Sequence, residues 1–145
     1  MPAPLHDQIV QAVKAACLVS PALAGGNVFD DALDDDMPEG VSEAIQIGML
    51  DSQPVASAYA DLEWQTVIRV SCKARRDVYG VNGKPSSILG AAVFARLTAD
   101  RTLNGLADTV GQPRMSADNS LQHTRIGVMH LDFPVRHRTP RNSIA

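Results

Sequence analysis

Residues 86–108 read SSILGAAVFARLTADRTLNGLAD, and this stretch decides the fold. Pro85 and Ser86 together form a helix-start signal. Five apolar side chains then recur at helical spacing, namely Ile88, Leu89, Ala92, Val93 and Leu97. The pattern predicts a helix that buries one face against a sheet. Asn104-Gly105 interrupts the pattern and predicts a turn that leads into strand-like sequence.

A second helix and a short strand are predicted near the start of the chain. Apolar residues at amphipathic spacing predict a helix over residues 5–23, and they are Ile9, Val10, Val13, Ala16 and Cys17. Pro21 and Gly25-Gly26 supply the signals that end this helix. A short strand is predicted directly afterwards, at residues 27–29.

Three longer strands complete the predicted elements, at residues 44–50, 62–72 and 129–139. In the first of them Ile45, Ile47 and Met49 alternate with Gln46 and Gly48, as a half-buried strand requires. In the second, the face predicted to lie against the helices consists of Leu62, Trp64, Thr66, Ile68, Val70 and Cys72. The opposite face, predicted to meet solvent or a neighbouring molecule, is mainly Glu63, Gln65, Arg69, Ser71 and Lys73.

Length and composition allow one domain. With 145 residues and 45% hydrophobic content, the chain can bury a core but has no room for separate catalytic and regulatory domains. We therefore predict a single α+β domain whose mixed or mainly antiparallel sheet of four or five strands carries two main helices on one side. Trp64, Phe94 and Phe133 are expected to anchor an otherwise aliphatic core, and Cys17 and Cys72 are expected to be small buried hydrophobes.

The order and spacing of these elements resemble the tail terminator proteins of long-tailed phages, the lambda-type minor tail protein among them, and the related tail completion proteins. The resemblance implies a structural virion protein, not an enzyme, that forms a ring on the tail tube, stops tube polymerisation and presents the head-joining surface. It implies three protein partners: further copies in a ring of six, the tail tube protein and the head–tail connector protein. It also implies assembly in the host cytoplasm, a location at the tail–neck junction of the virion, and non-specific contact with DNA in the ring lumen.

Two other classes of protein remain open at this stage. One is another neck or tail completion component, or a small non-catalytic binding module. The other is a small enzyme whose site is assembled from loops. An enzyme predicts a concave pocket with convergent titratable groups, whereas a tail terminator predicts oligomerisation through its surface.

Charge is distributed unevenly along the chain. Residues 1–63 hold eleven acidic side chains and one basic side chain, for a net charge of −10. Residues 64–145 hold twelve basic and five acidic side chains, for a net charge of +7. Two interpretations follow: opposite flanks attract one copy to the next, head to tail, or the two halves neutralise each other within one subunit.

Three charged segments are the candidate interfaces: an acidic loop at residues 30–40, a basic loop at 74–85 and a basic C-terminal tail at 136–145. Both loops are expected to be mobile in the free subunit because they are polar and contain glycine or proline. The candidate interface residues are Asp30, Asp31, Asp34, Asp35, Asp36, Arg75, Arg76, Lys84, Arg136 and Arg138.

The sequence predicts no catalytic residue, no cofactor and no metal ion. The acidic loop lacks the alternating ligands and central glycine of an EF-hand. Residues 80–86 invite comparison with a phosphate-binding loop, but Pro85 stands where that loop needs a serine or threonine. The four histidines lack helical metal spacing and are expected to be exposed or singly satisfied.

Two further alternatives concern localisation and nucleic acid. Residues 15–24 end in Ala22-Leu23-Ala24, which imitates a signal-peptidase site, but Lys14 interrupts the preceding apolar pattern and favours an amphipathic helix. No apolar run is long enough to span a membrane, so no membrane partner is expected. The arginines of residues 136–141 are suited to phosphate contact, but no aromatic residue interleaves with them.

Overall fold

The structure is a computed structural model, and it describes residues 3–30, 40–57, 61–118 and 126–140. Within these ranges, two α-helices, one 3-10 helix and six strands follow one another. They are α1 (Leu5–Leu18), η1 (Leu23–Gly26), β1 (Val28–Phe29), β2 (Glu43–Ser57), β3 (Asp61–Arg75), α2 (Pro85–Ala99), β4 (Thr109–Val110), β5 (Arg114–Asp118) and β6 (Ile126–Pro140). The predicted α+β class is confirmed, with six strands in the sheet where four or five were expected.

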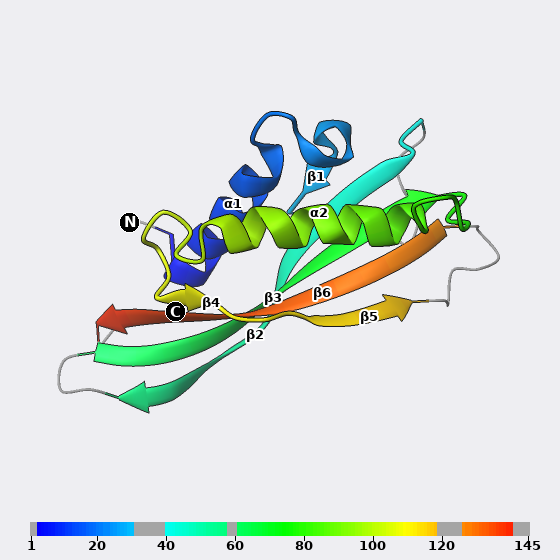
Figure 1. Cartoon of the computed structure of the whole chain (residues 1–145). Helices are drawn as coiled ribbons and strands as arrows, with labels where there is room; N and C mark the ends of the chain where they lie inside the picture. The colour runs from blue at the N-terminus through cyan, green and yellow to red at the C-terminus, as the bar shows by residue number, and fades with distance from the viewer. Residues whose placement is uncertain (1–2, 31–39, 58–60, 119–125, 141–145) are drawn as a thin grey trace.

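The strands form one mixed sheet in the order β1-β2-β3-β6-β4, with β5 also paired to β6. β1 runs parallel to β2, and every other pair is antiparallel. β5 and β4 pair with different parts of β6, at residues 128–132 and 135–136 respectively. At one end of the sheet β2, β3 and β6 extend past the helices, as Figure 1 shows at lower left.

Both helices lie on the same face of the sheet (Figure 1). α1 turns Ile9, Val13 and Cys17 toward the sheet at intervals of four residues, and all three are buried. α2 buries Leu89, Gly90, Val93 and Leu97, together with Ser86 at its start. At Gly90 the layers approach closely, because a Cβ there would lie 3.3 Å from Cδ1 of Leu131 on β6. Phe133 is the largest fully buried side chain of this core.

Helix α1 ends at Leu18, five residues before its predicted end at residue 23. The reason is Pro21, because a residue before proline is disfavoured in helical geometry and proline cannot donate to the helix. One of the carbonyl groups left without a helical partner, that of Ala16, accepts a hydrogen bond from α2, as do two carbonyl groups just beyond the helix. Arg96 donates to the backbone oxygens of Ala16 (3.0 Å) and Val19 (2.7 Å), and also to that of Pro21.

The three long predicted strands are longer in the structure, the short strand predicted at 27–29 is reduced to Val28–Phe29, and β5 was not separately predicted. On β3 the helix-facing residues Thr66, Ile68, Val70 and Cys72 are buried as predicted. Ser71 and Lys73, on the opposite face, are buried too, which the sequence pattern did not indicate. The cross-strand partners of Lys73 are Ala44 and Val128, which belong to a second apolar cluster on that face.

Several apolar side chains predicted to be buried are exposed. Ile88 is 47% exposed and Phe94 37% exposed, because the inward face of α2 follows Leu89, Val93 and Leu97. Met49 on β2 is 42% exposed. Phe133 is buried as predicted, whereas Trp64 is half-buried and donates its indole N–H to Oγ1 of Thr139 at 2.7 Å. Along the described ranges, neither helix combines the length and the apolar character needed to cross a bilayer.

Candidate assembly surface

The connection between β3 and α2 forms a projecting turn, residues 76–84, hereafter the β3–α2 turn. Its tip closes through two backbone hydrogen bonds, since the N–H of Gly80 donates to Gly83 O (3.1 Å) and the N–H of Gly83 donates to Gly80 O (3.3 Å). Gly83 has a φ of +110°, a conformation that side chains other than glycine rarely adopt. Val81 and Asn82 therefore occupy the tip of a tight, hydrogen-bonded turn.

Asp77 holds the base of the β3–α2 turn against the start of α2. Its carboxylate accepts hydrogen bonds from the backbone N–H of Ser86 at 2.8 Å and from the Ser86 hydroxyl at 2.7 Å. Asp77 thus caps α2, because Lys84 at the N-cap position makes no capping bond with its side chain. Gly127 on β6 makes room for this contact, since a Cβ there would lie 1.8 Å from Oδ2 of Asp77.

The β3–α2 turn presents apolar side chains to solvent. Val78 is 68% exposed, Tyr79 is 81% exposed and Val81 is fully exposed. Lys84 extends over Tyr79, with its Nζ 4.9 Å from the ring centroid, which is a cation–π contact. Arg76 is also exposed on this turn. The predicted basic loop is therefore an apolar projection with cations beside it, and residues 78–81, VYGV, are its signal in the sequence.

The other predicted basic residues lie elsewhere. Arg75 ends β3, and its Nε donates to Val41 O at 2.8 Å. Arg136 and Arg138 lie on β6 and not in a tail, which corrects the prediction for the part of 136–145 that the structure describes. Arg136 pairs with Glu63 and Arg138 with Asp108, both at 3.2 Å. These two arginines lie at the opposite end of β6 from the β3–α2 turn, so the structure does not bring the basic candidates together.

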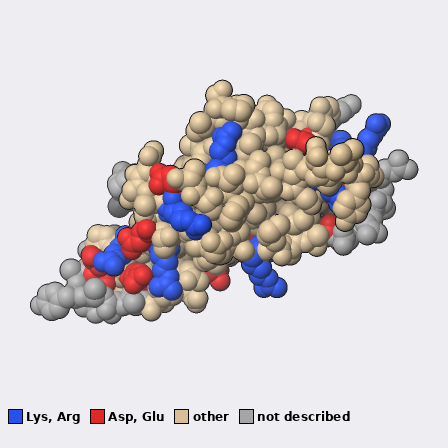
Figure 2. Space-filling view, viewed as in Figure 1, with Lys and Arg blue, Asp and Glu red and all other residues tan. Residues whose placement is uncertain are grey.

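Acidic and basic side chains interleave at that opposite end. Figure 2 shows red and blue atoms beside one another at the left of the molecule, where β3 begins and β6 ends. The pair formed by Arg136 and Glu63 joins the basic and acidic halves of the chain within one subunit. Neutralisation within the subunit, one of the two interpretations of the charge pattern, therefore occurs at this site.

Of the acidic candidates, Asp30 lies within the described residues, whereas Asp31, Asp34, Asp35 and Asp36 lie outside them. Gln11 on α1 donates to the Asp30 carboxylate, and Lys14 lies 3.6 Å from it. The hydrogen bond from Gln11, followed by the charge of Lys14, lowers the pKa of Asp30 below its ordinary value. Asp30 therefore remains ionised beside the first turns of α1.

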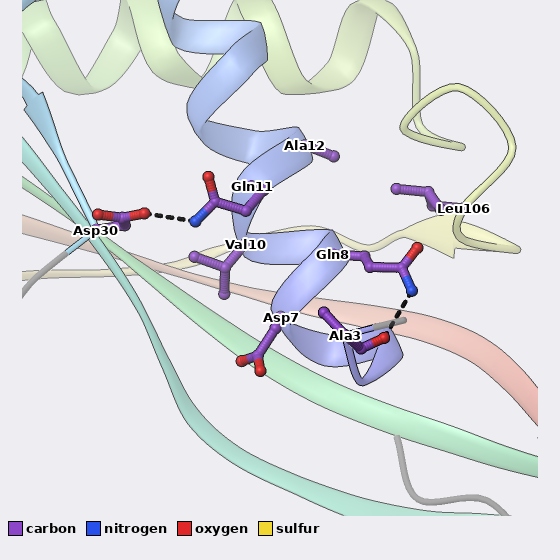
Figure 3. A pocket seen from close by; sticks show the side chains of 8 residues that line it. All are labelled: Ala3, Asp7, Gln8, Val10, Gln11, Ala12, Asp30 and Leu106. Carbon is purple, nitrogen blue, oxygen red and sulfur yellow. Dashed lines mark hydrogen bonds between the residues drawn. The ribbon is translucent and has the colours of Figure 1, made fainter. Parts of the chain in front are cut away.

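A shallow hollow of about 740 Å³, open to solvent, lies along the outer side of α1. Its polar lining is Asp7, Gln8, Gln11 and Asp30, and its apolar lining is Ala3, Val10, Ala12 and Leu106. Figure 3 shows the hydrogen bond from Gln11 to Asp30 on one side and that from Gln8 to the Ala3 oxygen (2.8 Å) on the other. The lining contains two carboxylates and no lysine or arginine, and we call it the acidic hollow.

On the face away from the helices, polar side chains pair across the strands. Arg69 donates to both oxygens of Asp132, at 2.8 and 3.0 Å, and this contact raises the pKa of Arg69. His130 shares a hydrogen bond of 2.8 Å with the hydroxyl of Ser71. Burial, followed by the charge of Arg69, lowers the pKa of His130. These groups satisfy one another and hold the sheet together, and they do not converge on the acidic hollow.

His137 is a fully buried histidine that makes a single hydrogen bond, consistent with the expectation that the histidines would be exposed or singly satisfied. Its Nε2 lies 2.6 Å from Oγ1 of Thr66, which in turn lies 2.7 Å from Oγ of Ser52. Within the part of the chain that the structure describes, its Nδ1 has no hydrogen-bond partner. Burial and the nearby His6 lower the pKa of His137.

The described residues include two cysteines and no cluster of metal ligands. Across the described ranges, no three His, Cys, Asp or Glu side chains lie close enough to hold a metal ion. Cys17 and Cys72 are free and buried, as predicted. Burial raises the pKa of the Cys17 thiol to about 11 and that of Cys72 to about 12, so neither forms a thiolate near neutral pH.

No protein-family model and no curated protein matches this sequence. Among solved structures, a chain from the virion of a native gene transfer agent particle is similar, with a TM-score of 0.63 and 14% sequence identity. The similarity covers 90% of this chain and 95% of that one, so the two share a fold over nearly their whole lengths. A sheath/tube terminator of an extracellular contractile injection system, PVC, in its extended state gives a TM-score of 0.46 at 11% identity; this chain spans 61% of its length and is itself covered in full.

Proposed function

We propose that this chain is a tail terminator-type structural protein of a phage-like particle. In this proposal six copies form a ring on the end of the tail tube, stop further tube polymerisation and present the surface to which the head–tail connector binds. The ring surrounds the path of the DNA at the tail–neck junction. The mechanism is surface complementarity between protein chains and involves no bond-making step.

The observation that carries the proposal is the fold shared with a chain of the gene transfer agent virion across 90% of this chain and 95% of the other. Coverage of this extent means that the similarity spans most of both chains and is not confined to one part of the sheet. The order of elements read from the sequence leads independently to the tail terminator proteins. A shared fold alone does not establish function, so the proposal needs a direct test.

The surface of the molecule supports an assembly role. Exposed apolar side chains gather on the β3–α2 turn, where Val78, Tyr79 and Val81 project together. Exposed apolar side chains that lie close together often mark a protein–protein contact. The acidic hollow has no histidine or cysteine in its lining, and its carboxylate Asp30 is already bonded to Gln11. These features favour a binding surface over an enzyme site.

Tail length tests the proposal. Particles are purified from cells that carry the intact gene and from cells in which an early stop codon interrupts it, and their tails are measured by electron microscopy. We expect overlong tails without heads when the protein is absent, and normal particles when the gene is restored on a plasmid. Tails of normal length that lack heads indicate another neck component. Complete particles with normal tails contradict a role in tail assembly.

A further inference from the structure

We propose that the β3–α2 turn of one copy binds the acidic hollow on α1 of the next copy, so that the subunits associate head to tail. The partner is a second copy of this chain, recognised by an apolar projection with cations beside it that meets an apolar surface edged by carboxylates. The inference deepens the proposed function and rests on it for the closure of the ring. The contact itself is argued from the two surfaces.

The β3–α2 turn is built to present a fixed shape. Two backbone hydrogen bonds between Gly80 and Gly83 close its tip, and the Asp77 carboxylate fixes its base to Ser86. Tyr79, the aromatic residue at its centre, is 81% exposed. Aromatic side chains that are already held in place are the usual anchors of protein interfaces, because little freedom is lost on binding.

The acidic hollow complements this turn in chemistry. The accessible part of its apolar lining, Ala3, Ala12 and Leu106, offers contact for valine and tyrosine side chains. Asp30 is already held by Gln11 and Lys14. The Asp7 side chain, in contrast, is 59% exposed, 3.3 Å from His6, and is a carboxylate that Arg76 and Lys84 of a neighbouring turn can reach. Opposite charges at the rim of such a contact increase the rate of association and fix its register.

The two surfaces lie far apart on one subunit. In Figure 1 the β3–α2 turn is at the right-hand start of α2, whereas the first half of α1 and the loop that carries Leu106 lie toward the left. Figure 2 shows Lys and Arg side chains projecting at that right-hand end. A contact between two different surfaces at separate ends is heterologous, and it builds a ring when the rotation between copies closes.

The charge pattern of the chain favours a second copy as the occupant. The β3–α2 turn belongs to residues 64–145, with a net charge of +7, and both carboxylates of the hollow belong to residues 1–63, with a net charge of −10. Ion pairs within the subunit already use Arg136 and Arg138. Arg76 and Lys84 remain at the surface beside the exposed apolar residues, where a neighbouring copy can reach them.

Disulfide trapping between copies tests the contact. Val81→Cys places a thiol on the turn, and Gln8→Cys places one in the hollow; the natural cysteines are buried and do not interfere. Each single variant alone is expected to stay monomeric on non-reducing gels, whereas an oxidised mixture of the two yields dimers. A chain with both substitutions yields a ladder that ends at the ring size. Asn82→Cys is a second position at the tip in case Val81→Cys disturbs folding.

The matched control places the thiol at an exposed apolar site away from the β3–α2 turn. Met115→Cys on β5, a residue that is 58% exposed, is expected to give no dimer with Gln8→Cys. Tyr79→Ala in the mixed pair is expected to weaken association roughly 10- to 30-fold, as for an aromatic anchor at an interface. Arg76→Glu with Lys84→Glu is expected to abolish trapping, and Asp7→Lys in the hollow partner to restore part of it.

Trapping is carried out on concentrated protein and on purified tails, which separates this inference from the proposed function. If tails are overlong without the protein but the mixed pair gives no dimer in either sample, the contact is wrong and the tail role stands. If the mixed pair gives dimers but tail length is normal without the protein, the contact stands and the tail role is wrong. Dimers from either single variant alone indicate a two-fold contact and overturn the head-to-tail arrangement.

Discussion

His137 makes the stability of this protein depend on pH. The imidazole is fully buried against Thr66, and burial lowers its pKa, with His6 and Asp108 as the nearby charged groups. In the unfolded chain a histidine binds a proton near pH 6.5, whereas in the folded chain it does so only at lower pH. Between these two values the unfolded state holds more protons, so acidification favours unfolding.

We therefore expect the melting temperature to fall between pH 7.5 and pH 5.5, with most of the loss below about pH 6.5. The pKa of His130 is also lowered in the folded chain, so its protonation contributes to the same loss of stability. His137→Gln retains a donor for Thr66 and is expected to melt lower at pH 7.5 but to lose less on acidification. Calorimetry of both proteins at the two pH values measures the difference. An equal loss in parent and variant contradicts this role for His137.

Gly127 on β6 is predicted to be intolerant of alanine. A Cβ at this position meets three atoms of Asp77, the nearest at 1.8 Å. Asp77 then has to move and release the N–H and hydroxyl of Ser86, which lies 3% exposed at the start of α2. Leaving such buried groups without partners destabilises a fold by about 1–3 kcal/mol.

Urea denaturation of Gly127→Ala measures this effect. The matched control is Gly48→Ala on β2, where a Cβ meets nothing within 4 Å and the backbone does not require glycine. The control is expected to change the free energy of unfolding by less than about 0.5 kcal/mol. Equal effects at both positions refute the close contact between Gly127 and Asp77.

At the scale of elements, Arg96 joins the two helices. The side chain leaves α2 and donates to backbone oxygens of Ala16, Val19 and Pro21, where α1 ends. Arg96→Met keeps much of the aliphatic stem but removes these donors, so we expect a loss of about 2–3 kcal/mol. Hydrogen exchange is expected to become faster in the last turn of α1. Arg114→Met, an exposed position on β5, is the control and is expected to leave exchange in α1 unchanged.

Trp64 secures β3 to β6 where these strands extend past the helices. The side chain is half-buried, so Trp64→Ala is expected to destabilise by about 1–3 kcal/mol, below the range for a fully buried aromatic residue. Trp64→Phe keeps an aromatic ring but removes the hydrogen bond to Thr139 and part of the ring contact, and it is expected to lose about 1 kcal/mol. Circular dichroism follows both melts, because Trp64 is the single tryptophan and its replacement removes the tryptophan fluorescence. If Trp64→Phe loses more stability than Trp64→Ala, the ring contact and the hydrogen bond do not contribute as described.

The long strands and both helix starts were predictable because their signals are local. Alternation of apolar and polar residues marks β2 and β3, and Pro85 marks the start of α2. The buried face of α2 was harder to predict, because this helix is apolar on most sides. Ile88 and Phe94 fit the apolar pattern as well as Leu89 does, and only the position of the sheet distinguishes them.

Features that depend on distant residues could not be read from the sequence. The early end of α1 depends on Pro21 locally, but the carbonyl groups of Ala16 in its last turn and of Val19 just beyond it accept from Arg96, which lies on another helix. Burial of Lys73 follows from its pairing with Ala44 and Val128. For the candidate site, the charged residues and the apolar VYGV segment stand in the sequence, whereas the exposure of that segment and its support by Gly127 required the fold.

For the whole molecule, the distribution of charge predicts association that depends on salt. We expect the isolated protein to be a monomer or a weak oligomer and to form a closed ring when tail tube protein is present. Added salt is expected to weaken the contacts, because exposed charges are screened within about 10 Å at 0.1 M. Light scattering at rising protein concentration, with and without tube protein, measures both effects. A tight two-fold dimer that is insensitive to salt contradicts the ring.

The rate at which the two buried thiols react with a reagent measures how often the fold opens. Cys17 belongs to the helical layer and Cys72 to the sheet, and neither side of this interface admits solvent in the folded chain. An alkylating reagent therefore reacts at a rate set by how often the two layers separate. The same reagent, added to free subunits and to intact particles, compares how often the layers open before and after assembly. The ratio of the two rates reports how strongly neighbouring molecules hold each subunit closed, with no change to the natural sequence.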